Sequence, residues 1–128
     1  MGSITAIYAS LLALLYVWLA ARVILYRRDN RISLGDSGDP EMRQRMRTHA
    51  NCAEYAPIGV ILLLLLELQG VPSWVAHASG LCLVAGRVLH AIGLQPHPMN
   101  FRQRTLGMAL TLSQIIGTAI VLLALALL

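Results

Sequence analysis

The chain has 128 residues, of which 57% are hydrophobic and 12% are charged, and its formal net charge is +4. Together with a mean hydropathy of +0.66, this composition excludes an ordinary soluble domain and indicates an integral membrane protein. One crossing of a bilayer core about 30 Å thick needs about 20 helical residues, so there is room for about four spans and no separate soluble domain. We therefore predict an all-α bundle of four transmembrane helices that occupies residues 1–128 as a single domain.

Uncharged runs of residues locate the expected spans. Three of the four are long enough to cross a membrane unaided. The second is too short, so its helix must also use the polar residues that precede it. The four runs cover residues 4–21, 55–66, 68–86 and 105–128.

The second helix is expected to begin near Glu41, because Asp39 and Pro40 are residue types that start helices. If it ends near Gln69, it is about 43 Å long. A helix of that length is longer than the hydrocarbon core is thick, so part of it should project through the headgroup layer.

The predicted connections differ in character. Residues 27–40 form a flexible polar loop, residues 70–72 a tight turn, and residues 95–100 a short loop stiffened by Pro96 and Pro98. All ten basic residues are arginine, and with four spans they all fall on the side of the first and third connections. The positive-inside rule places those two loops in the cytoplasm and both termini on the opposite side. Because the arginines gather at span ends and form no exposed basic face, a nucleic-acid partner is not expected.

A polar stripe enters the membrane on the second helix. Its members follow helical spacings of four, four, three and four, so they share one face. Charges at this depth are costly against lipid, so the stripe should face other helices or a water-filled cavity. Many arginines and few acids meet at this level, which indicates an anionic ligand. The stripe consists of Arg43, Arg47, Asn51, Glu54 and Ile58.

Other chemistries find no support in the residue pattern. No Ser-His-Asp arrangement, glycine-rich phosphate loop or Walker motif is present. The four histidines lie far apart in the sequence, so no metal site is expected.

The run from Arg47 to Pro57, RTHANCAEYAP, resembles the helix 2 signature of the membrane-associated proteins in eicosanoid and glutathione metabolism, the MAPEG family. This family includes microsomal glutathione transferases and the leukotriene- and prostaglandin-forming synthases. The segments RRDNRIS, GRVLH and RTLG also stand in the family's order, so the resemblance covers nearly the whole chain.

The resemblance implies a homotrimer that binds one glutathione in each cleft between neighbouring subunits. By position, the residue that activates the sulfur is Arg104, with Arg102 as the alternative. The implied glutathione contacts are Arg47, Asn51, Glu54 and Tyr55 on helix 2, Arg27 or Arg28 on helix 1, and Arg87 and His90 on helix 3. We add His49 on helix 2 to this set, although it stands where relatives carry other polar residues.

The implied ligand agrees with the residue chemistry. Glutathione has two carboxylates, one ammonium group and a thiol, which complement arginines, one glutamate and one asparagine. A guanidinium near the sulfur favours the nucleophilic thiolate. The expected activity is a glutathione transferase, with or without peroxidase activity, that acts on a hydrophobic electrophile or lipid hydroperoxide arriving from the membrane lipids. Leu94, and Leu106 or Met108, stand where several synthases of the family carry tyrosine, which argues against a specialised eicosanoid reaction.

Two other functional classes remain open. A non-catalytic, lipid-binding member of the family would share the fold, but such relatives depart at the helix 2 arginine and glutamate, which this chain keeps. A small proton-coupled drug exporter also has four short spans. Its membrane glutamate lies in helix 1, whereas Glu54 lies in helix 2 among arginines.

Overall fold

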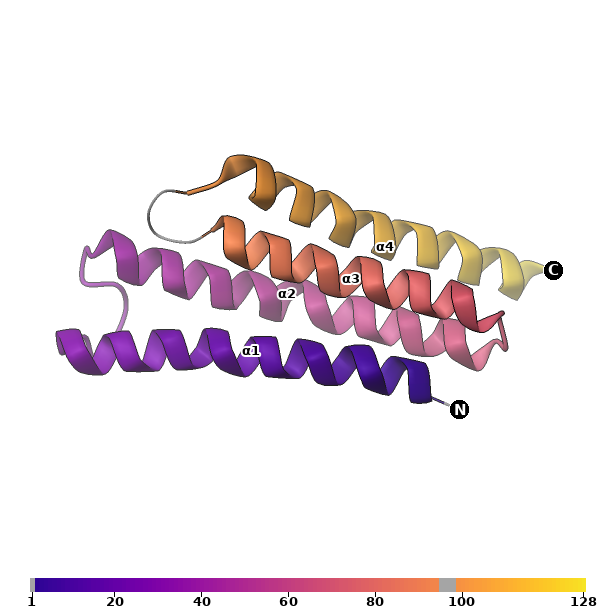
Figure 1. The fold of residues 1–128 in the computed structure, drawn as a ribbon, viewed down its shortest axis with the longest axis horizontal. Coiled ribbons are helices and arrows are strands. Elements are labelled where there is room, and N and C mark those ends of the chain that lie inside the picture. Colours follow the sequence, from indigo (N-terminus) through magenta and orange to yellow (C-terminus); the bar gives the residue numbers. More distant parts are fainter. Residues whose placement is uncertain (1, 95–98) are drawn as a thin grey trace.

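The computed structural model of the chain describes residues 2–94 and 99–128, and it contains four α-helices (Figure 1). Each helix is long and apolar enough to cross a membrane. The predicted all-α architecture with four spans is therefore confirmed, and the protein is a multi-pass integral membrane protein. The helices are α1 (Ser3–Asn30), α2 (Pro40–Leu68), α3 (Ser73–Gly93) and α4 (Phe101–Leu127).

The start of α2 agrees with the prediction from Asp39 and Pro40. The Asp39 carboxylate accepts hydrogen bonds from the backbone N–H groups of Glu41 and Met42, at 2.9 and 3.2 Å. Pro40 occupies the first helical position, where its missing N–H has no intrahelical partner to lose. The sequence is thus a sufficient explanation of where this helix begins.

Helices α1, α3 and α4 extend beyond their uncharged runs. The last residue of helix α1 is Asn30, and the next residue, Arg31, has a left-handed φ of 54° that stops the helix. The predicted start of the first loop at residue 27 is therefore wrong. Helix α3 begins after the 70–72 turn and runs past Arg87 to Gly93. A charged residue at headgroup level ends a hydrophobic run but does not end a helix. The predicted third loop lies mostly outside the described residues, since it includes 95–98.

Helix α3 is the most enclosed of the four spans. It packs against all three other helices, whereas α1 and α4 have no contact with each other within residues 2–94 and 99–128. Helix α4 buries only Gly107, Thr111, Gln114 and Thr118. Most of the large apolar side chains on α1 and α4 consequently face outward.

Glu67 near the end of α2 fixes the beginning of α1. Its carboxylate accepts hydrogen bonds from the N–H groups of Ile4 and Thr5, at 3.1 and 2.8 Å, and from the Thr5 hydroxyl at 2.7 Å. Helix α1 has no cap of its own, so Glu67 satisfies N–H groups that are otherwise unpaired at a helix start. Both ends of the chain lie at this end of the bundle, opposite the α1–α2 connection (Figure 1).

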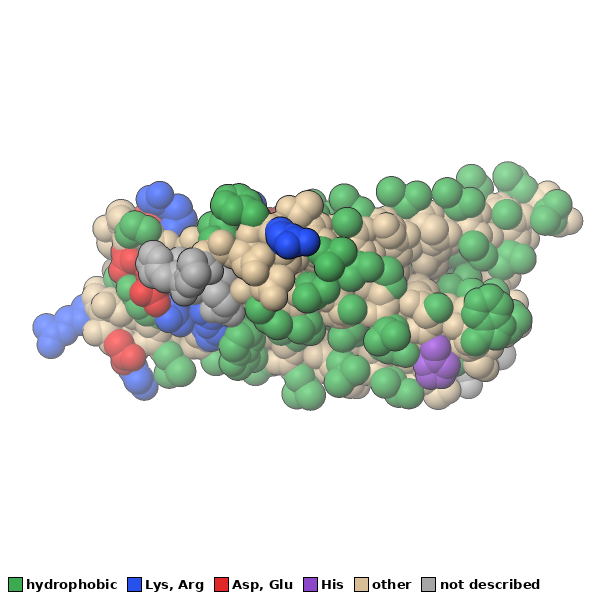
Figure 2. Space-filling view, turned by 45° about the horizontal axis from the view of Figure 1, so that its top comes forward, with side chains coloured by type: hydrophobic (Ala, Val, Ile, Leu, Met, Phe, Trp, Pro, Cys, Tyr) green, Lys and Arg blue, Asp and Glu red, His purple; other side chains and the backbone are tan. Residues whose placement is uncertain are grey.

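The charged side chains gather at the end of the molecule that carries the α1–α2 connection, while hydrophobic side chains cover most of the remaining visible surface (Figure 2). The arginines that sequence analysis placed at one membrane level lie toward this end of the four helices.

Candidate functional site

Side chains of α2, α3 and α4 line two adjoining, partly open cavities at the arginine-rich end. Their volumes are about 220 and 410 Å³, and the larger lies within the range of about 300–1,000 Å³ typical of small-molecule sites. Both cavities are lined by Asn51 of α2, His90 of α3 and Arg104 of α4. The smaller is also lined by Arg43, Gln44, Arg47, Leu94 and Met99, and the larger by Phe101, Thr105 and Met108.

The described walls of these cavities contain three arginines and no carboxylate. One of the three, Arg43, already pairs with Asp36 in the first loop, with 2.6 Å between Arg43 Nε and Asp36 Oδ2. The hydrogen bond from this guanidinium holds the pKa of the Asp36 carboxyl below its ordinary value. Arg47 and Arg104 supply the remaining positive charge. The cavities are therefore suited to an anion.

Arg87 has a different environment from the other arginines. It is 2% exposed, and its Nε atom donates to the Thr111 hydroxyl at 2.9 Å. Its Nη1 atom donates to the side-chain and backbone oxygens of Asn51, and its Cζ atom lies 5.4 Å from the centre of the Tyr55 ring. A buried charge needs such hydrogen bonds to offset the loss of water. Arg87 thus joins α2, α3 and α4 and orients Asn51.

The position of Asn51 follows from this contact. Because its Oδ1 atom accepts from Arg87, the hydrogen-bond pattern assigns Nδ2 as the group left to donate elsewhere. Asn51 lines both cavities. Its amide is therefore a donor for a ligand oxygen.

Glycines bring α3 and α4 close together behind His90 and Arg104. A Cβ atom at Gly107 would lie 2.3 Å from the backbone nitrogen of His90, and one at Gly93 would lie 2.3 Å from that of Arg104. No larger residue fits these positions without displacement of a helix. The close approach of the two backbones holds the side chains of His90 and Arg104 beside the same cavities.

Arg104 and Arg102 lie on different sides of α4. Arg104 lines the two cavities shared with α2 and α3, and its Nη1 atom lies 3.6 Å from the Met99 sulfur. Arg102 lines a different groove of about 480 Å³, which also contains Leu106 and Ala109 and shares only Phe101 and Thr105 with the larger cavity. Residues two apart on a helix point in different directions, and the structure brings only Arg104 next to Asn51.

Glu54 and Tyr55 lie beside these cavities rather than in the walls that the structure describes. Glu54 pairs with Arg47 at 3.8 Å, and the two side chains are 52% and 60% exposed. An ion pair this exposed and this long contributes little to stability, so both groups are available to a ligand or to a neighbouring molecule. Tyr55 lies next to the buried Arg87.

Three of the predicted site residues make their contacts away from these cavities. Arg27 donates to the carbonyl of Gly35 at 2.8 Å, and Arg28 pairs with the adjacent Asp29. The His49 ring lies 4.7 Å from that of Tyr16 on α1, and its buried Nε2 atom has no partner in the described chain. His49 is two positions from both Arg47 and Asn51, which turns it to the other side of α2.

Thr111 is a neighbour of Arg87 that the sequence analysis did not identify. It belongs to a row of small and polar residues on α4, comprising Gly107, Thr111, Gln114 and Thr118, which are also its buried residues. Their spacings of four, three and four in an otherwise apolar helix indicate a face turned toward other helices. That pattern was available in the sequence.

Comparisons with known proteins identify the family of the chain. A model of the MAPEG family matches residues 5–126. The chain belongs to the MAPEG family. It is also 38% identical over 108 residues to the inner membrane protein YecN of Escherichia coli, in strains K12 and O6:H1, and the match covers 84% of this chain and 81% of the relative.

Membership of the MAPEG family makes this chain a membrane protein of the glutathione- and eicosanoid-metabolism family. The match includes all four helices almost to their ends, so the cavities between α2, α3 and α4 lie within the part that resembles the family.

Proposed function

We propose that this MAPEG protein is a membrane glutathione transferase. The observation that carries the proposal is the pair of adjoining cavities whose described walls hold Arg47, Asn51 and Arg104 and no carboxylate. Arginines bind carboxylates through paired hydrogen bonds, and glutathione offers two carboxylates. Asn51 supplies a further donor, and Glu54 supplies an acceptor for the ligand ammonium group.

Arg104 is the proposed sulfur-activating residue. It has no carboxylate partner among the described residues, so its guanidinium is free to stabilise a negatively charged sulfur. Arg102, on the other side of α4, is the less suitable candidate. His90 lines the same cavities and is a further group that can hydrogen-bond to a ligand there.

The proposed reaction joins the thiolate to a hydrophobic electrophile that arrives from the acyl chains. A carbon–sulfur bond forms, the leaving group departs with its electron pair, and the thiol proton goes to solvent. With a lipid hydroperoxide as the second substrate, the oxygen–oxygen bond breaks and the hydroperoxide is reduced to an alcohol and water. Two glutathione molecules are oxidised to glutathione disulfide in the same reaction.

The complete site is proposed to lie between subunits of a homotrimer. Arg27, Arg28 and His49 of one chain do not line the cavities of the same chain, so a neighbouring copy would have to supply the contacts predicted for these residues. The proposed membrane orientation places the arginine-rich end in the cytoplasm and both termini on the opposite side.

Calorimetric titration of the detergent-solubilised protein with glutathione tests the function. The transferase proposal predicts saturable binding together with thioether formation from an aromatic electrophile. Binding without product would favour the non-catalytic scaffold. Absence of binding, with proton-coupled export of hydrophobic cations from vesicles, would favour the exporter.

A further inference from the structure

One stripe of α1 carries a single arginine among apolar side chains. Leu11, Leu14, Trp18, Arg22 and Leu25 follow one another at spacings of three, four, four and three and so share one face. The four apolar members are exposed, and Arg22 is partly buried. An exposed apolar stripe on a membrane-spanning helix is suited to lipid acyl chains, and Arg22 stands near its arginine-rich end.

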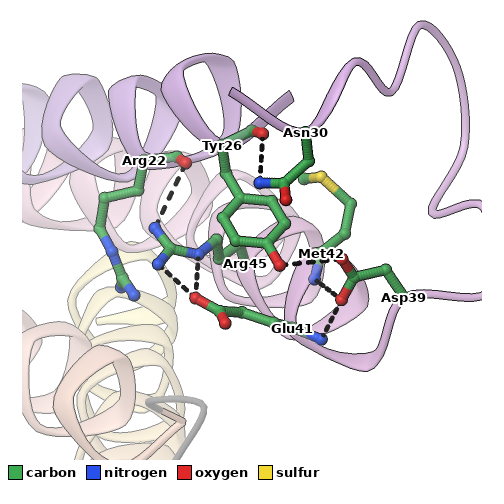
Figure 3. A network of polar contacts seen from close by, with 7 residues as sticks. All are labelled: Arg22, Tyr26, Asn30, Asp39, Glu41, Met42 and Arg45. Atoms are coloured by element: carbon green, nitrogen blue, oxygen red, sulfur yellow. Dashed lines mark hydrogen bonds and ion pairs between the residues drawn. The ribbon is translucent and has the colours of Figure 1, made fainter. Parts of the chain in front are cut away.

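The Arg22 guanidinium makes no hydrogen bond and no ion pair with any other residue of the described chain. Its Cζ atom lies 5.0 Å from the centre of the Trp18 ring. Figure 3 shows the Arg22 carbonyl oxygen accepting from Arg45, at 3.4 Å, while the guanidinium of Arg22 is joined to nothing. Five potential N–H donors are therefore left without an acceptor.

The neighbouring charges do not supply that acceptor. Oxygen Oε1 of Glu41 takes two N–H groups of Arg45, at 3.1 and 2.5 Å, and Arg45 also lies 4.7 Å from the centre of the Tyr26 ring. The Arg22 guanidinium interacts with the Glu41 and Arg45 side chains only through space, and the Arg45 charge repels it. The remaining acid of this network, Asp39, accepts from Tyr26 at 2.8 Å.

We propose that Arg22 and Trp18 bind the phosphate of an anionic glycerophospholipid, with an acyl chain lying along Leu14 and Leu11. A guanidinium and a phosphodiester match in charge and geometry, and tryptophan favours the membrane interface. The apolar stripe identifies the ligand as a lipid rather than a free phosphate. A net negative headgroup is favoured because the Arg22 charge has no acidic partner among the described residues, whereas Glu41 balances the charge of Arg45.

This lipid site is separate from the proposed glutathione site. It lies on the outer side of α1, whereas the cavities that hold Asn51 and Arg104 lie between α2, α3 and α4. Failure of either proposal would leave the other standing.

Tryptophan fluorescence in reconstituted bilayers tests the proposal. The chain has two tryptophans, so Trp74→Phe leaves Trp18 as the single reporter; Trp74 is 72% exposed. Brominated lipids quench tryptophan on contact. In phosphatidylcholine bilayers, brominated phosphatidylglycerol is expected to quench Trp18 about fivefold more effectively than brominated phosphatidylcholine at the same mole fraction, because one arginine near a charged surface contributes about 1 kcal/mol.

Arg22→Gln in the Trp74→Phe background should abolish that preference. Arg31→Gln is the matched control, since it removes the same charge from an exposed position at the end of α1, and it should keep the preference. If Arg22→Gln does not reconstitute, Arg22→Lys replaces it, and its preference should fall to about half because an ammonium lacks the paired donors.

Three results would overturn the lipid site. These are equal quenching by the two lipids in the Trp74→Phe protein, an unchanged preference in the Arg22 variant, or an equal loss of preference in Arg31→Gln, which would mean that net charge alone attracts the lipid.

Discussion

Asn51 is the residue at which the buried and the open parts of the site meet. On one side its oxygen accepts from Arg87, which the bundle encloses. On the other side Asn51 lines both cavities. The hydrogen bond that Arg87 needs in order to be buried thus also holds the Asn51 amide donor at the place where the ligand is proposed to bind.

Asn51→Asp separates these two roles. The aspartate keeps an acceptor for Arg87 but removes the amide donor and adds negative charge to the cavity. We expect the thermal midpoint to hold or rise and glutathione affinity to fall on the order of tenfold or more. Calorimetry and thermal melting measure the two effects. Asn30→Asp, which makes the same chemical change at an exposed position of α1, should leave affinity unchanged; an equal loss there would contradict a local role for Asn51.

Arg47→Ala and Glu54→Gln test the exposed pair beside the cavities. Their mutual contact at 3.8 Å is weak, so we expect little loss of stability in either variant. Each removes one charged partner of the proposed ligand, so the glutathione dissociation constant should rise about tenfold or more. Unchanged dissociation constants in both variants would mean that the pair serves assembly of the protein instead.

At the scale of the helices, the close approach of α3 and α4 positions Arg104. A Cβ atom at Gly93 would lie 2.3 Å from the Arg104 nitrogen and 2.9 Å from the Asn100 carbonyl oxygen. Gly93→Ala should therefore push the first turn of α4 away from α3, at a cost of about 1–3 kcal/mol, and should reduce conjugation activity.

Gly117→Ala is the matched control for this prediction. Gly117 lies on α4, the helix that Gly93→Ala should displace, and a Cβ atom there would meet nothing within 4 Å, so alanine should stabilise α4 by up to about 1 kcal/mol. Thermal melting and initial rates are the measurements. Equal behaviour of the two variants would show that the helix contact does not position Arg104.

The cap of α2 gives a pH dependence. The hydrogen bond from Tyr26 holds the pKa of the Asp39 carboxyl below its ordinary value. A carboxyl whose pKa is lower in the folded state stabilises the fold above its unfolded value of about 3.9 and loses that contribution as pH falls through the folded value. An asparagine in place of Asp39 can still cap α2 through its side-chain oxygen, but it carries no charge.

Asp39→Asn should therefore melt at a lower temperature than the parent at pH 7. The difference between the two should shrink as pH falls below about 4. Melting curves of both proteins over this range provide the test, and a constant difference at every pH would contradict the assignment to the Asp39 charge.

Hydropathy and helix-start signals were enough to predict four helices and the start of α2 near Glu41. They could not give the ends of α1 and α3, because arginines interrupt the apolar pattern without ending the helices. Helical spacing placed Arg47 and Asn51 on one face, and both line one cavity. Spacing within α2 alone could not show that α1 turns Arg27 away from that cavity, because this depends on how the helices pack.

At the scale of the whole molecule, the single chain leaves much of its polar stripe uncovered. Glu54 is 52% exposed within a span, which is costly against lipid. We therefore expect the protein to assemble with this face covered by neighbouring copies, as a trimer. Mass measurement in detergent by light scattering should give three chains per particle. An active monomer would contradict both the trimer and the shared site.

The central claim is that Arg104 activates the sulfur of bound glutathione. Thiolate absorbance in the near ultraviolet, titrated against pH with glutathione present, measures this most directly. The parent protein should hold a thiolate well below the ordinary thiol pKa of about 8.5. Arg104→Ala should return the titration toward that value while much of the binding remains, whereas Arg102→Ala should titrate like the parent. A parent-like titration in Arg104→Ala would contradict the claim, and a shift in Arg102→Ala alone would assign the role to Arg102.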